Sequence, residues 1–258
     1  MCSPRPDAAA AVATAACHGG RRRVAAAWLI ALLVVVATIG NPPLRAASGS
    51  HVSFRAEDGR TIDGLLFEAD QRPAAAVVLL PMLGRPKDDW QAVGQRLSDA
   101  GVTALAIDLP AQTMPSDPRE VSGWTGQVRA AVGFLSSRSE VRPGAIGVAG
   151  ASLGASIAAL ASASDPRVRA LALISPATEY RGVRIEAAMR QYGGRPALLL
   201  ASSQDPYAAR TARELSGKDA PGPREVRMSD VKAHGTMLLA QDKDLVRGLV
   251  EWFQRTLG

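Results

Sequence analysis

From residue 51 onward, short apolar runs alternate with longer segments in which apolar residues recur at helical spacing. Residues 74–80 are continuously apolar, as expected for a strand that is covered on both faces. The alternation then repeats to the end of the chain. Because strands that alternate with helices form parallel sheets with helices on both faces, the sequence predicts a doubly wound α/β fold.

The expected sheet has about eight strands in one mostly parallel sheet, and it begins with a hairpin around the turn sequence Glu57-Asp58-Gly59. The expected strands are 52–55, 61–68, 74–80, 102–107, 145–149, 168–174, 197–201 and 225–228. The expected helices are 88–100, 121–135, 153–163, 184–192, 207–215 and 244–257. Because no linker interrupts residues 51–258, we expect them to form one domain.

Residues 1–50 have the composition of a leader. Three consecutive arginines at 21–23 precede residues 24–40, a stretch without a charged side chain. A basic flank before an apolar run is typical of export signals. This run is longer than a typical signal core and shorter than a typical membrane span, so a cleaved signal peptide and a retained signal anchor both stay open. Either one predicts that residues 51–258 lie outside the cytoplasm, as a periplasmic, secreted or membrane-anchored domain.

Charge and cysteine content exclude several classes of protein. The net charge is +6, but residues 1–50 hold five arginines and one aspartate, so residues 51–258 carry only +2. Without a basic stripe interleaved with aromatic residues, nucleic acid is not expected as a partner. Both cysteines, Cys2 and Cys17, lie in the leader. The domain therefore has no thiol nucleophile, zinc-thiolate site or disulfide.

The most specific motif is Gly150-Ala151-Ser152-Leu153-Gly154, which follows an expected strand and precedes an expected helix. In a G-x-S-x-G turn the serine hydroxyl projects above the carboxyl edge of the sheet, and the glycines remove Cβ atoms that would clash. Ser152 is therefore the candidate nucleophile, with Gly150 and Gly154 as the glycines of the nucleophile elbow.

A serine hydroxyl needs a base, and the domain offers only His51 and His234. His234 follows the last expected strand, in the position that the chain order serine, acid, histidine requires. Asp205 follows the strand before it and is the candidate that orients the imidazole. Asp205 also precedes a proline, so a helix N-cap is its competing role. Asp230 and Glu179 are alternative acids.

The developing oxyanion needs two backbone donors. The N–H of Leu153, directly after the nucleophile, is the first candidate. The second normally comes from the loop after the first long parallel strand, where Leu83 is the expected donor.

These residues give the domain a clear resemblance to the α/β-hydrolase superfamily, nearest to its dienelactone-hydrolase-like and small serine esterase branch. The resemblance covers residues 51–258. It departs from the pattern at Pro81-Met82, where relatives usually have His-Gly, and in lacking the cysteine nucleophile of dienelactone hydrolases proper. Only 19 residues separate Pro176 from Pro196, so no large lid covers the expected pocket.

The resemblance implies hydrolysis of a small-molecule carboxylic ester, small or short-chain, through an acyl-enzyme. Peptidase, amidase or thioesterase action by the same residues is an alternative, and so is a non-catalytic, hydrolase-like binding protein of the cell envelope. No metal or organic cofactor is expected, because the sequence has neither a two-histidine zinc cluster nor a glycine-rich phosphate loop. Residues 24–40 leave membrane anchoring open, and the sequence does not predict an oligomeric state.

Overall fold

The computed structural model of the chain describes residues 49–258. The signal or anchor that we predict at residues 24–40 lies outside the described residues. Among the residues that are described, no helix combines the length and apolar character that crossing a membrane requires.

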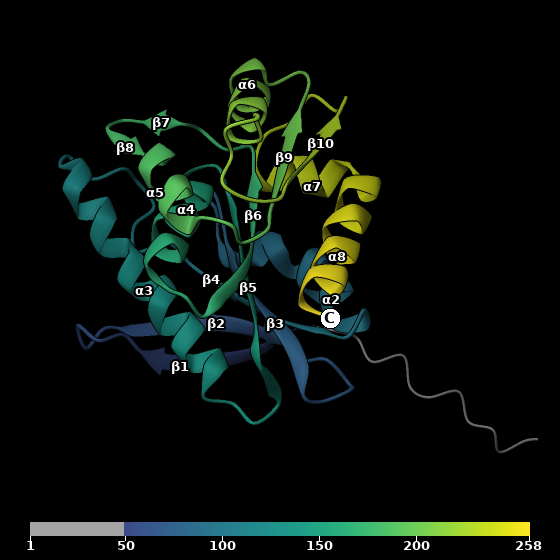
Figure 1. Cartoon of the computed structure of the whole chain (residues 1–258). Helices are drawn as coiled ribbons and strands as arrows, with labels where there is room; N and C mark the ends of the chain where they lie inside the picture. Colours follow the sequence, from purple (N-terminus) through teal and green to yellow (C-terminus); the bar gives the residue numbers. More distant parts are fainter. Residues whose placement is uncertain (1–48) are drawn as a thin grey trace, which may run out of the picture. The chain divides into compact units, whose positions relative to one another are not determined.

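The centre of the domain is an eight-stranded sheet in the order β1-β2-β4-β3-β5-β6-β9-β10 (Figure 1). The first strand pairs antiparallel with the second, the second pairs antiparallel with β4, and all further neighbours are parallel. This confirms the predicted mostly parallel sheet. The strands are β1 (Ser50–Arg55), β2 (Thr61–Phe67), β3 (Ala74–Leu80), β4 (Val102–Ile107), β5 (Val141–Ala151), β6 (Val168–Ile174), β9 (Ala197–Ser202) and β10 (Arg224–Ser229).

Helices cover both faces of the sheet, which separates the core into two clusters (Figure 1). Because successive strand residues point to opposite faces, Val78 packs in one cluster and its neighbours Val77 and Leu79 in the other. The helices of the first cluster are α3 (Pro118–Ser136), α4 (Leu153–Ser164), α5 (Glu186–Tyr192) and α6 (Pro206–Leu215). Those of the second are the 3₁₀ helix η2 (Lys87–Trp90), α2 (Gln91–Asp99), α7 (Thr236–Gln241) and α8 (Lys243–Leu257).

Two short features were not predicted from the sequence. A hairpin of β7 (Glu179–Tyr180) and β8 (Val183–Arg184) stands between β6 and α5. Its turn places Arg181 and Gly182 at positive φ, and the Glu179 carboxylate accepts the Gly182 N–H. The second feature is α7, where we expected only a loop before the closing helix. Burial of Leu238 and Leu239 in the second core cluster stabilises this six-residue helix.

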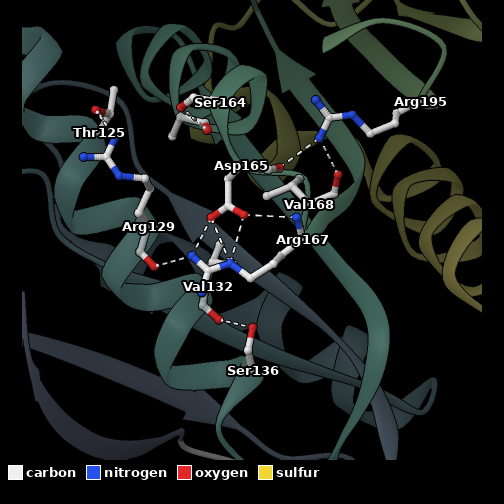
Figure 2. Close-up of polar contacts among 10 residues, drawn as sticks. Thr125, Arg129, Val132, Ser136, Ser164, Asp165, Arg167, Val168 and Arg195 are labelled. Carbon is white, nitrogen blue, oxygen red and sulfur yellow. Dashed lines mark hydrogen bonds and ion pairs between the residues drawn. The ribbon is translucent and has the colours of Figure 1, made fainter.

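Polar contacts around Asp165 join the segments that lead into β6 and β9 (Figure 2). Asp165, which is 4% exposed, follows α4 and accepts hydrogen bonds from the backbone and the guanidinium of Arg167 at the start of β6. Arg195 donates to the carbonyl oxygens of Asp165 and Val168. The segments that enter β6 and β9 are therefore tied together at the edge that lies away from Ser152.

Candidate active site

Ser152 lies in the sharp turn between β5 and α4. Its backbone has φ 54° and ψ −118°, a conformation that residues other than glycine rarely adopt. The N–H of Ser152 donates to the carbonyl of Ile174 on the neighbouring β6 at 2.9 Å, and its carbonyl accepts the N–H of Ala155 in the first turn of α4. The turn is thus held from the sheet and from the helix while its side chain lies at the carboxyl edge of β5.

The glycines of the motif are required by contacts between backbone segments. A Cβ at Gly150 would lie 2.2 Å from the carbonyl oxygen of Gly154, and a Cβ at Gly154 would lie 2.3 Å from the carbonyl oxygen of Pro81. Close approach at Gly154 brings the start of α4 against the end of β3. The turn that carries Ser152 therefore lies directly beside the loop that carries Leu83.

The structure brings the three predicted side chains into one hydrogen-bonded line. The distance between His234 Nε2 and Ser152 Oγ is 2.8 Å, and that between His234 Nδ1 and Asp205 Oδ2 is 2.5 Å. The His234 side chain is 44% exposed and that of Asp205 is 20% exposed. The Asp205 carboxylate accepts a hydrogen bond from the Nδ1–H group of His234. It therefore favours the tautomer with the proton on Nδ1, which leaves Nε2 free to accept the serine proton.

Asp205 makes both of the contacts that its sequence context predicts. While Oδ2 faces the imidazole, Oδ1 accepts the N–H of Ala208 at 3.2 Å and caps α6. The alternative acids have other partners: Asp230 accepts from the Ser203 hydroxyl, and Glu179 accepts from the backbone of its own hairpin. Of the three carboxylates, Asp205 is the one that the structure places on His234.

The loop after β3 carries the other predicted donor. Arg85 N–H donates to the carbonyl of Met82, which closes a turn with Leu83 and Gly84 at its centre. Gly84 has φ +74°, so this turn requires a residue that tolerates the left-handed region. The unusual Met82 packs on the residue after the histidine, since its sulfur lies 2.7 Å from where a Gly235 Cβ would be. Leu153, the first residue of α4, has an N–H without a partner inside the helix.

The structure adds two residues, Asp89 and Thr236, that the sequence did not single out as part of the site. The Gly235 N–H donates to Ser175 Oγ at 2.9 Å, and Thr236 Oγ1 donates to Asp89 Oδ2 at 2.7 Å. Ser175 adopts φ +49° at the end of β6, a strained conformation of a kind that gathers near functional sites. No local motif predicts these contacts, because each joins segments that lie far apart in the sequence.

The described residues offer no cluster of three or more His, Cys, Asp or Glu side chains that could hold a metal ion. The arrangement is instead a hydroxyl, an imidazole and a carboxylate in series. Such a set can move a proton from the hydroxyl to the imidazole.

Comparison with known proteins identifies the family of the chain. The sequence profile described as "Alpha/beta hydrolase family" matches residues 77–254, which run from within β3 through most of α8 and include every residue of the hydrogen-bonded line. The chain belongs to the alpha/beta hydrolase family. Within this alpha/beta hydrolase, the match begins at the first long parallel strand and leaves β1 and β2 outside.

The proteins that resemble this alpha/beta hydrolase are named for different activities. It is 31% identical over 163 residues to the polyketide transferase ATR5 of Stachybotrys chlorohalonatus (strain IBT 40285). That match covers 58% of this chain and 55% of the relative, so it spans about half of the relative's length.

Two solved structures share the fold of this alpha/beta hydrolase. The dienelactone hydrolase from Anabaena variabilis has a TM-score of 0.65 and 18% identity, covering 82% of this chain and 100% of that one. The esterase domain of a Rhodothermus marinus protein has a TM-score of 0.62 and 18% identity, covering 81% and 99%.

Proposed function

We propose that this protein is a serine hydrolase that cleaves small or short-chain carboxylic esters. The observation that carries the proposal is the continuous line from Ser152 Oγ through His234 to Asp205, with separations of 2.8 and 2.5 Å. These are the distances that proton transfer from a serine hydroxyl to a histidine base requires.

In the proposed reaction, Ser152 Oγ attacks the ester carbonyl carbon while His234 Nε2 accepts the hydroxyl proton. The carbonyl oxygen becomes an oxyanion, which the N–H groups of Leu83 and Leu153 stabilise. His234 then donates its proton to the leaving alcohol as the carbon–oxygen bond breaks. A water molecule attacks the acyl-enzyme, His234 accepts its proton, and return of that proton to Ser152 releases the acid. Asp205 stabilises the imidazolium in both halves of the reaction.

An ester is the preferred substrate class because its alcohol leaving group needs less assistance than an amine does. The segment between β6 and α5 contains only the short hairpin β7–β8, which favours small substrates that enter from solvent. The esterase and dienelactone hydrolase folds among its structural neighbours support the same class. Amide and thioester hydrolysis by the same side chains remain the alternatives, together with a binding protein that does no chemistry.

A second candidate is transfer of the acyl group to an acceptor other than water. The observation that favours it is the name of the curated relative, a polyketide transferase. In that reaction an alcohol or amine would attack the acyl-enzyme in place of water, and His234 would accept its proton. The first half of the mechanism would be unchanged.

The test is a matched series of p-nitrophenyl acetate, butyrate and octanoate, with p-nitroacetanilide and a short thioester as comparators. We expect the highest kcat/KM with the acetate or butyrate ester and none in Ser152→Ala. Preference for the anilide or the thioester would identify the alternative reaction. Methyl ester formation in added methanol, at a rate above that of hydrolysis, would favour the transferase. No turnover of any compound by the wild type would contradict the proposal.

A further inference from the structure

The two residues that follow His234 anchor its turn to other segments of the fold. The His234 ring is nearly half exposed, but Gly235 is buried and Thr236 is only 2% exposed. Gly235 N–H donates to Ser175 Oγ at the end of β6. Thr236 Oγ1 donates to Asp89 Oδ2 at 2.7 Å, a contact between α7 and η2. The position of the imidazole therefore depends on groups outside its own loop.

Asp89 is well placed to act as a fixed acceptor. Its side chain is 13% exposed, and Arg85 donates to both of its oxygens, with Nε at 2.7 Å from Oδ2 and Nη2 at 2.8 Å from Oδ1. The Arg85 guanidinium lowers the pKa of Asp89, so its carboxylate stays charged at neutral pH. A hydrogen bond from a hydroxyl to a charged carboxylate is stronger than one between neutral groups.

The same ion pair reaches the loop of the proposed oxyanion donor. Arg85 directly follows Leu83 and Gly84, and its own N–H closes their turn onto Met82. Met82 in turn packs against Gly235. The turn with the backbone donor and the turn with the base are therefore joined through Arg85 and Asp89 on one side and through Met82 on the other.

We propose that Asp89 is a positioning residue that acts through the Thr236 hydroxyl to hold His234 in register with Ser152 and the oxyanion turn. The inference rests on the proposed serine hydrolase function and assigns a further residue to the same site. Asp89 does not contact the reacting atoms. Its effect is on geometry: a shift of the histidine by about 1 Å lowers rates by as much as about a hundredfold in enzymes of this kind.

A purely structural role for the same hydrogen bond makes a different prediction. If the contact only stabilised the start of α7, its loss would lower the free energy of unfolding and leave kcat unchanged below the melting temperature. A positioning role instead lowers kcat with little change in KM, because substrate contacts are not altered.

The decisive variants are Thr236→Val, which removes the hydroxyl and keeps the branched shape, and Thr236→Ser, which keeps the hydroxyl. Thr103→Val is the matched control. Thr103 is also buried, 4% exposed, and its hydroxyl oxygen accepts the Ala69 N–H at 3.2 Å near the amino end of β4, the sheet edge away from the site. We expect Thr236→Val to lower kcat for p-nitrophenyl acetate by about 10- to 100-fold with KM unchanged within about twofold. Thr236→Ser and Thr103→Val should keep the wild-type kcat.

A second measurement does not depend on turnover. The ring N–H signal of His234 in a proton NMR spectrum, assigned with His234→Gln, should be sharp in the wild type and in Thr236→Ser and broadened in Thr236→Val. If the wild type cleaves no ester, the proposed function fails, while this spectrum still decides whether the contact holds the ring. A wild-type kcat and an unchanged ring signal in Thr236→Val would overturn the inference, and so would an equal loss of kcat in Thr103→Val.

Discussion

For Asp205, the effect on stability and the proposed effect on catalysis can be measured separately, because one carboxylate oxygen faces His234 and the other caps α6. Asparagine is also a good N-cap and has nearly the same volume. Asp205→Asn should therefore change the free energy of unfolding by less than about 0.5 kcal/mol. The same substitution should lower kcat by about 10⁴-fold, because a neutral amide no longer selects the required tautomer or stabilises the imidazolium. Urea unfolding and ester hydrolysis measure the two effects on one sample.

Asp230→Asn and Glu179→Gln are the matched controls, since these carboxylates bind elsewhere. Both should keep the wild-type kcat. Full activity of Asp205→Asn beside an inactive control would show that the orienting acid had been misassigned.

Residues in the loops that follow strands could be placed near one another from the sequence, because the carboxyl edge of a parallel sheet collects these loops. Ser152, Asp205 and His234 all belong to this class. Asp89 and Thr236 could not be identified as partners from the sequence, because they are 147 residues apart and each simply lies at or near the start of a helix. Their pairing depends on how η2 and α7 pack against each other, which no local pattern encodes.

Among the elements, α4 leaves no room for a side chain at Gly154. Gly154→Ala would place its Cβ 2.3 Å from the Pro81 carbonyl oxygen, and a backbone carbonyl of β3's end cannot rotate away as a flexible side chain could. We expect it to destabilise the fold by about 3 kcal/mol or more, as overpacking at a fixed contact does. Gly123→Ala in α3 is the control, because nothing lies within 4 Å of its Cβ position. It should stabilise the protein by up to about 1 kcal/mol. Equal urea midpoints for the two variants would refute this account of the elbow.

Continuously apolar strands were the elements that the sequence predicted best, and elements of only a few residues were predicted worst. The longest strand, β5 (Val141–Ala151), begins four residues before the predicted strand 145–149, because polar and turn-forming residues at 142–144 interrupt the apolar run. The strands at 74–80, 102–107 and 168–174 have the predicted bounds. The β7–β8 hairpin has two residues per strand, too few for any period to show, and α7 is six residues long. Asp117 and Pro118 begin α3 three residues before its predicted start, because the capping aspartate and the proline precede the first apolar residue of the pattern.

For the whole molecule, the architecture followed from the alternation of strands and helices, and that architecture also predicted which distant segments meet at the carboxyl edge of the sheet. Ser152 and His234 are 82 residues apart, and His234 and Asp205 are 29 residues apart. One sheet edge brings all three together. The export of the domain remains a prediction from residues 1–50, which lie almost wholly outside the described part of the chain.

The free energy of unfolding should decrease at acid pH, because carboxylates that accept hydrogen bonds in the native state become protonated there. The Ser229 hydroxyl, together with the N–H groups at the start of α8, lowers the pKa of Asp242 below its ordinary value of 3.8. Because the folded pKa is the lower one, this contribution is present at neutral pH and is lost as pH falls below about 4 through the folded value. Urea unfolding at pH 7, 5, 4 and 3 should show the loss. In Asp242→Asn, which retains a capping side chain, the decline should be shallower; an identical decline would contradict this assignment.

The most direct measurement is the mass of the intact protein after exposure to a fluorophosphonate, followed by peptide mapping of the adduct. A fluorophosphonate phosphonylates a serine only where a base removes its proton and donors stabilise the charged oxygen. We predict a single adduct on Ser152 in the wild type, none in Ser152→Ala, and strongly slowed labelling in His234→Gln. A wild type that stays unmodified, or an adduct on any other serine, would contradict the claim that Ser152, His234 and Asp205 form a nucleophilic site.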